Sequence, residues 1–100
     1  MNFFYNFFLL KGIEYGVLRV PVGGVDFSLR PYSYDDTPND FDLKNFSFGP
    51  EDIKWKIPFC QAANAKSKKT IKYFASAWTA PSWMKTNNNF SGNGILFKKI

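Results

Sequence analysis

The fold is decided by a predicted strand that stops in an indole-rich loop, Tyr73-Phe74-Ala75-Ser76-Ala77-Trp78-Thr79-Ala80-Pro81-Ser82-Trp83-Met84-Lys85. Tyr73 and Phe74 favour a strand, and Pro81 cannot continue its hydrogen-bond ladder. The indole of Trp78 offers a broad apolar face and one N–H donor, which suits the C–H faces and hydroxyl edges of a sugar. A buried position at the strand end suits it too, because most tryptophans are largely buried. On this stretch alone we favour the core position for Trp78 and leave the sugar-binding alternative open.

A second strand is predicted earlier in the chain, over residues 17–20, and Pro21 ends it. Its aliphatic, β-branched composition is typical of a strand buried on both faces, as in a parallel sheet. Arg19 interrupts the run, so it either points to solvent from an edge strand or reaches a site where the strand ends. Gly23 and Gly24 then predict a tight turn. For Asp26, just beyond this turn, a turn or capping role is more common than ligand binding.

A helix is predicted between the two strands. Gly49-Pro50-Glu51-Asp52 is typical of a helix start, with an early proline and acidic residues in the first turn. Apolar residues continue at helical spacing, and the basic segment Lys66-Ser67-Lys68-Lys69 ends the helix. Pro58 must kink or split this helix. Cys60 is expected to be a buried small hydrophobe.

The strand–helix–strand order predicts two parallel strands joined by a right-handed crossover. Parallel strands share their carboxyl edge, so Asp26 and Trp78 are expected on one face. The long polar stretch from Arg30 to Glu51 exceeds the roughly 12–15 residues of most loops. Its aromatic residues indicate an ordered loop that packs on something: Tyr32, Tyr34, Phe41, Phe46 and Phe48.

Composition excludes several kinds of chemistry within these 100 residues. There is no histidine and one cysteine, so no Ser–His–Asp or Cys–His arrangement, internal disulfide or histidine-containing metal cluster can form here. No metal or cofactor is expected. Residues 3–11 predict the last turns of a helix with Gly12 as its C-cap. The first ten residues resemble a signal peptide only faintly, and no apolar run reaches the roughly 18 residues of a membrane span.

Three motifs in collinear order resemble the glucosylceramidases (acid β-glucosidases) of glycoside hydrolase family 30, namely Arg19-Val20-Pro21-Val22-Gly23-Gly24-Val25-Asp26-Phe27-Ser28, Asp36-Thr37-Pro38-Asn39-Asp40-Phe41 and Ala75-Ser76-Ala77-Trp78-Thr79-Ala80-Pro81-Ser82-Trp83-Met84-Lys85-Thr86-Asn87. The resemblance implies an α/β fold that is part of a (β/α)8 TIM barrel. Residues 1–100 would form one partial barrel domain, about strands two and three with the intervening helix. Such a barrel takes about 250 residues, so the 100-residue chain is expected to be a fragment, incomplete as it stands.

The resemblance also implies roles for individual residues. Asp26, Phe27 and Trp78 match substrate-binding residues of the family: the aspartate accepts hydrogen bonds from glucose hydroxyls, the indole N–H donates one, and the phenyl ring forms a pocket wall. Arg19 matches an arginine beneath the nucleophile, where its charge would keep that glutamate ionised. Asn45, in the sequon Asn45-Phe46-Ser47, matches a glycosylation site. Trp83 gains no sugar-binding role and is expected to be structural.

The family hydrolyses glucosylceramide to glucose and ceramide with retention, using two glutamates about 5–5.5 Å apart. The resemblance places both beyond Ile100, because neither Glu14 nor Glu51 occupies a matching position. No catalytic residue is therefore expected in this chain, which should be inactive alone. The family relationship implies a lysosomal location, a membrane surface and a lipid-presenting activator protein as partners, and a secretory signal preceding the residues given.

Two other interpretations remain. One is a catalytically dead carbohydrate-binding remnant or pseudoenzyme that keeps Asp26 and Trp78. The other is nucleic-acid binding, suggested by a net charge of +5 and 20% aromatic residues. Residues 11–16 resemble an RNA-recognition strand only faintly, without the aromatic residues that such a motif needs. No nucleic-acid partner is expected.

Overall fold

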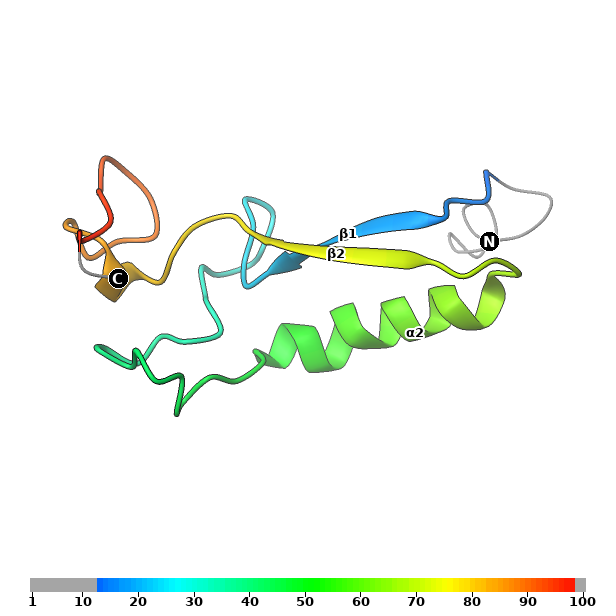
Figure 1. Cartoon of the computed structure of the whole chain (residues 1–100), viewed down its shortest axis with the longest axis horizontal. Coiled ribbons are helices and arrows are strands. Elements are labelled where there is room, and N and C mark those ends of the chain that lie inside the picture. The colour runs from blue at the N-terminus through cyan, green and yellow to red at the C-terminus, as the bar shows by residue number, and fades with distance from the viewer. Residues whose placement is uncertain (1–12, 99–100) are drawn as a thin grey trace. The chain divides into compact units, whose positions relative to one another are not determined.

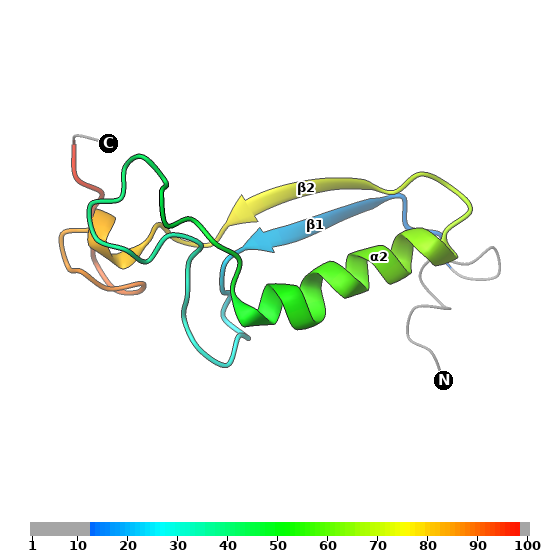
Figure 2. The same cartoon turned by 90° about the horizontal axis from the view of Figure 1, so that it is seen from below.

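The computed structural model describes residues 13–98. The helix end expected over residues 3–11 therefore lies outside the described residues. The elements follow in the order β1 (Val17–Val22), η1 (Asp52–Lys56), α2 (Ile57–Lys66), β2 (Lys72–Ala77) and η2 (Ser82–Met84), where η1 is a π-helical turn and η2 a 3-10 turn (Figure 1). β1 and β2 are hydrogen-bonded neighbours in a two-stranded sheet, and their arrowheads point the same way (Figure 2). The predicted parallel strand–helix–strand arrangement is confirmed.

The chain divides into two compact units. The helical unit comprises Met1–Val20 and Pro50–Ala75, and the loop unit comprises Pro21–Gly49 and Ser76–Ile100. Each strand begins in the helical unit and ends in the loop unit. The loops that follow the two strands therefore belong to the same unit.

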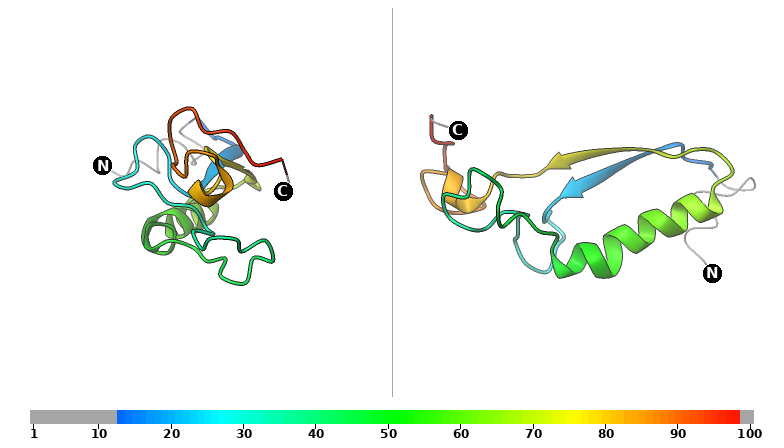
Figure 3. Two further views of the ribbon diagram at one scale, coloured as in Figure 1. Left: turned by 90° about the vertical axis from the view of Figure 1, so that its left-hand side faces the viewer. Right: turned by 60° about the horizontal axis from the view of Figure 1, so that its bottom comes forward.

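The core of the helical unit is small. Ala63 of α2 and Ile71 are buried, and Leu18 of β1 packs against them. The Tyr73 hydroxyl of β2 donates a hydrogen bond to the Cys60 carbonyl oxygen of α2 at 3.1 Å. These contacts hold α2 along one side of the strands (Figure 3).

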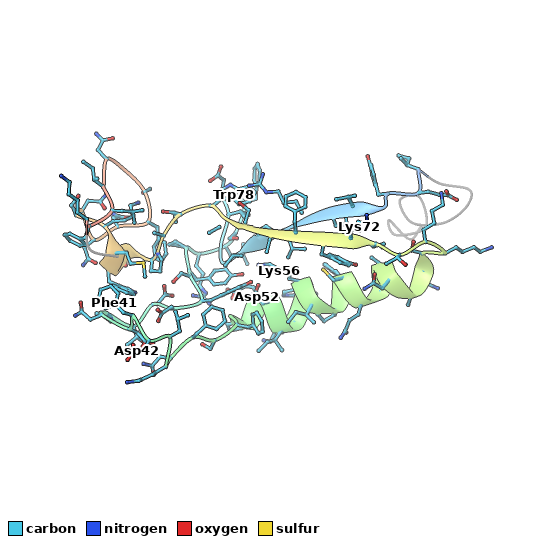
Figure 4. All side chains as sticks on the ribbon, viewed as in Figure 1. Phe41, Asp42, Asp52, Lys56, Lys72 and Trp78 are labelled. Atoms are coloured by element: carbon cyan, nitrogen blue, oxygen red, sulfur yellow. The ribbon has the colours of Figure 1, made fainter. Side chains whose placement is uncertain are left out.

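The helix changes from π-helical to α-helical winding just before Pro58, and it is continuous there rather than split. Pro58 stands in the first turn of α2, and the π-helical turn η1 comes directly before it. Proline lacks an N–H donor and crowds the preceding turn, and a wider π turn accommodates such crowding. In η1 the carboxylate of Asp52 is fully buried and pairs with Lys56 one turn later (Figure 4). Cys60 is half-buried rather than fully buried, and burial raises the pKa of its thiol.

The prediction that the first strand is buried on both faces is wrong for this chain. Leu18 faces the core of the helical unit, whereas Val17 is 57% exposed and Arg19 is exposed. The described residues place a helix on one side of the sheet only, so side chains that alternate with Leu18 meet solvent. β1 also runs through Pro21 to Val22. Proline is tolerated in a strand at the edge of a sheet, and β1 is one of the two strands of the described sheet.

A tight glycine turn follows β1 in the loop unit. Gly23 has a φ of 76°, and a Cβ there would lie 2.7 Å from the Tyr32 carbonyl oxygen. Only glycine fits this combination of backbone conformation and close approach. The Gly24 N–H donates to the same oxygen at 2.9 Å. The turn therefore brings Tyr32, which is 5% exposed, back against the end of β1.

The long stretch from Arg30 to Glu51 is ordered, as its aromatic residues predict. The rings of Tyr34 and Phe46 pack edge to face with centroids 5.6 Å apart. The Phe41 ring packs against Trp83 in the same manner at 5.0 Å. Trp83 also donates its indole N–H to the Asp35 carbonyl oxygen at 2.8 Å. The expected structural role of Trp83 is confirmed, because it ties this loop to η2.

Candidate binding site at the ends of the two strands

The loop unit contains a hollow of about 260 Å³ beyond the ends of both strands. It is lined by Gly24, Val25, Asp26, Pro31, Tyr32, Trp78, Thr79, Asn89, Phe90 and Ser91. Asp26 and Trp78, which the parallel strands predict on one face, thus lie at the same hollow. Trp78 follows β2 directly and is 45% exposed (Figure 4). The core position that its local sequence favours is therefore wrong.

A short turn presents Asp26. The Ser28 N–H donates to the Val25 carbonyl oxygen at 2.9 Å, and the Val25 N–H donates to the Ser28 hydroxyl at 2.9 Å. The turn is held by Ser28, and no hydrogen bond or ion pair of the Asp26 carboxylate is found within residues 13–98. Its oxygens are exposed and can accept hydrogen bonds from a ligand.

The other predicted site residues are not among those that line this hollow. The Phe27 ring is 97% exposed and is not among the lining residues. Arg19 lies on the part of β1 that belongs to the helical unit. Asn45 is exposed, and its backbone N–H donates to the Asp40 carboxylate at 2.6 Å. The roles that the resemblance implies for these three residues stay predictions.

Several lining residues could not be found from the motifs. Tyr32 reaches the hollow only because the turn at Gly23 folds the chain back, and its ring also carries the Arg30 guanidinium 4.8 Å from its centroid. Asn89, Phe90 and Ser91 come from a loop in which sequence patterns predict no site. The only signal there is the tripeptide Asn89-Phe90-Ser91, a glycosylation sequon in pattern.

The pKa values of two neighbouring carboxyl groups in the Arg30–Glu51 stretch are shifted in opposite directions. Both side-chain oxygens of Asp35 are buried. Burial and the nearby Asp40 carboxylate raise the pKa of Asp35. Asp40 accepts backbone N–H bonds from Asn45 and Lys44 at 2.6 and 2.9 Å, and these lower its pKa. The Asp35 carboxyl therefore keeps its proton to a higher pH than the Asp40 carboxyl does.

The hollow has the chemistry of a polyol site. It combines a carboxylate acceptor, an indole, a phenol and an amide, which together offer acceptors and donors to hydroxyl groups. Sites for drug-sized ligands usually measure about 300–1,000 Å³, so 260 Å³ suits one small ring. Asp26 is the only carboxylate among its lining residues. Glu14 and Glu51 belong to the helical unit, where Glu14 pairs with Lys69 at 2.8 Å. The described residues thus supply binding groups here but no pair of carboxylates for acid–base chemistry.

Known proteins resemble almost the whole chain. Residues 2–100 match the glycosyl hydrolase family 30 TIM-barrel domain. Lysosomal acid glucosylceramidase of Mus musculus is 50% identical over 91 residues, which is 91% of this chain and 18% of the mouse protein. Endo-1,6-beta-D-glucanase BGN16.3 of Trichoderma harzianum is 32% identical over 85 residues, covering 82% of this chain and 17% of the fungal protein.

A solved structure supports the same assignment. SrfJ from Salmonella typhimurium superposes with a TM-score of 0.84 and 33% identity, covering 97% of this chain and 21% of SrfJ. The chain spans about a fifth of the length of these relatives. Its strand–helix–strand arrangement, with a sheet that is not closed, is accordingly a piece of a TIM barrel. The chain belongs to glycoside hydrolase family 30.

Proposed function

We propose that this chain is the part of a retaining β-glucosidase that helps to bind glucose, and that the whole enzyme hydrolyses glucosylceramide to glucose and ceramide. The carrying observation is the meeting of Asp26 and Trp78 at one hollow of monosaccharide size. The 50% identity to a mouse protein named lysosomal acid glucosylceramidase supports the substrate. The two catalytic glutamates of such an enzyme would come from residues outside this chain.

Each predicted residue has a separate role in this proposal. The Asp26 carboxylate accepts hydrogen bonds from two neighbouring hydroxyls, since ionised acceptors form the stronger bonds. The Trp78 N–H donates to the sugar while its ring covers an apolar face. Phe27 supplies a further aromatic wall, and Arg19 keeps the nucleophile ionised from below. Asn45, which is exposed, carries a glycan.

A chimera tests the proposal directly. The matched 91 residues of the mouse protein are replaced by the matching residues of this chain, so that the mouse protein supplies the remainder. We expect the chimera to hydrolyse glucosylceramide and the isolated 100-residue chain to be inactive. An inactive chimera that unfolds cooperatively would contradict the proposal and favour the dead carbohydrate-binding remnant. Because the fungal relative is named as a β-1,6-glucanase, a β-1,6-glucan is assayed beside the glucolipid.

The mouse relative's name also supports a lysosomal location for the whole protein. We propose in addition that the enzyme meets its lipid at a membrane surface with an activator protein. No helix among residues 13–98 is long and apolar enough to span a bilayer. Hydrolysis of glucosylceramide in vesicles, with and without anionic lipid, measures this dependence on a surface.

The buried carboxyl of Asp35 predicts that the stability of the fold depends on pH. The pKa of this buried carboxyl is raised above its ordinary value of 3.8, so the unfolded chain releases the proton at lower pH than the folded chain does. Stability therefore falls as pH rises from 3.8 through the folded-state pKa. We expect Asp35→Asn in the chimera to raise the melting temperature at pH 7.5 more than at pH 4.5.

An exposed aspartate provides the control for this pH effect. Asp42 is 74% exposed and pairs with Lys44, and the neighbouring charges that raise the pKa of Asp35 are those of Asp40 and Asp36. Asp42→Asn should therefore leave the melting temperature nearly unchanged at both pH values. Equal shifts at both pH values for Asp35→Asn would contradict a raised pKa.

A further inference from the structure

The loop after η2 closes on itself and places its tip at the hollow. The Thr86 N–H donates to the Ile95 carbonyl oxygen at 2.9 Å, and the Ile95 N–H donates to the Thr86 hydroxyl at 3.0 Å. These bonds close the base of the loop. Within it, the Asn87 side-chain amide donates to the Ser91 carbonyl oxygen at 2.7 Å. A Cβ at Gly94 would overlap the Asn87 side chain, so the loop is tightly folded around Asn87.

A buried lysine fixes the tip of this loop. Lys85 is 8% exposed, and its Nζ donates to the Phe90 carbonyl oxygen at 3.0 Å and to the Thr79 hydroxyl at 3.3 Å. Both partners are neutral oxygens, and both belong to residues that line the hollow. Burying an ammonium group without a carboxylate partner is costly. The burial of Lys85 is explained by its two hydrogen bonds, which link Phe90 to Thr79.

We propose that Asn89 and Phe90 form a third wall of the sugar site, beside Asp26 and Trp78, and that Lys85 is the positioning residue that holds this wall against Thr79. The inference rests on the proposed sugar-binding function. The Asn89 side-chain oxygen accepts from the Ser91 N–H at 3.3 Å, and its amide N–H groups can donate to a hydroxyl. Phe90 supplies an apolar surface for the C–H groups of the ring. Asn89 is then occupied by substrate recognition, and its sequon remains without a glycan.

The test is a set of substitutions in the chimera. Lys85→Met keeps most of the length of the side chain and removes both hydrogen bonds of the ammonium group. We expect KM for the glucoside to rise about tenfold, because the two charged hydrogen bonds that hold the wall against Thr79 are lost, with a smaller change in kcat. Asn89→Ala should raise KM by about fivefold, as one neutral hydrogen bond to the sugar is lost. Lys44→Met is the matched control, because the Lys44 side chain is exposed and, within residues 13–98, pairs only with Asp42.

Hydrogen exchange supplies a measurement that does not depend on activity. Lys85→Met should speed exchange of the amides at residues 88–91 and leave those at residues 43–47 unchanged. Unchanged KM and unchanged exchange in Lys85→Met would overturn the proposal, and so would a fall in kcat with KM constant. If Asp26→Ala impairs hydrolysis while Asn89→Ala and Lys85→Met do not, the third wall is wrong and the proposed function stands. If the folded chimera is inactive, the proposed function fails and exchange alone decides whether Lys85 holds the wall.

Discussion

Replacing Asp26 with alanine in the chimera is expected to lower kcat/KM for a glucoside by about tenfold to 150-fold. Hydrogen bonds to a charged group contribute about 1.5–3 kcal/mol, and each 1.4 kcal/mol or so corresponds to a factor of ten. The carboxylate is exposed at the hollow and makes no hydrogen bond or ion pair within the described part of the chain. Removing the carboxylate should therefore weaken substrate binding and leave the melting temperature unchanged. Steady-state kinetics and a thermal melt on the same variant measure the two effects separately.

A second substitution separates charge from shape. Asp26→Asn keeps the shape of the side chain and one acceptor oxygen. Its kcat/KM should therefore lie between those of the parent chimera and Asp26→Ala. Asp42→Ala is the matched control, because Asp42 is an exposed aspartate of the loop unit that pairs with Lys44 and lines a different hollow. A loss below tenfold for Asp26→Ala would contradict a charged hydrogen bond to the sugar. A lowered melting temperature in that variant would indicate a structural role.

The parts of the fold that depend on local sequence could be predicted. Strand-forming runs, the helix start at Gly49-Pro50 and the change of helical winding before Pro58 each follow from a few adjacent residues. The meeting of Asp26 and Trp78 could also be predicted, because it needs only that the two strands be parallel. The shared carboxyl edge of the two strands is stronger evidence for the position of Trp78 than the general tendency of tryptophan to be buried. Functional sites of this class of fold lie at that edge.

The rest depends on contacts that no short pattern records. Tyr32 reaches the hollow through a turn at Gly23, and the wall at Asn89 depends on a buried Lys85 whose partners lie five and six residues away. A lysine in a polar loop gives no sign of burial before the loop is folded. The exposure of Val17 was missed for a different reason. Whether both faces of a strand are buried depends on which elements cover each face. The strand's own residues show only that burial would be compatible with their side chains.

The isolated 100-residue chain is expected to show no cooperative thermal transition. Among the described residues, the buried apolar side chains are Tyr32, Ala63 and Ile71 alone. Large apolar side chains such as Phe27 and Leu29 are almost fully exposed, at 97% and 102%. The loop unit also holds an open, mainly apolar hollow of about 440 Å³ lined by residues including Met84. A two-stranded sheet is marginally stable at best in water, so burial this slight does not offset the entropy of ordering the chain.

Calorimetry and near-ultraviolet circular dichroism measure this directly. We expect a broad, non-cooperative change on heating and weak near-ultraviolet signals despite the high aromatic content. Adding the mouse protein from which the matched 91 residues have been removed should restore a sharp transition, because the barrel would then cover the exposed strands and helix. A sharp transition of the chain alone, with equal calorimetric and van't Hoff enthalpies, would contradict the expectation. A melting temperature that rises with chain concentration would instead show self-association, in which a second copy covers the apolar surface that a complete barrel would otherwise bury.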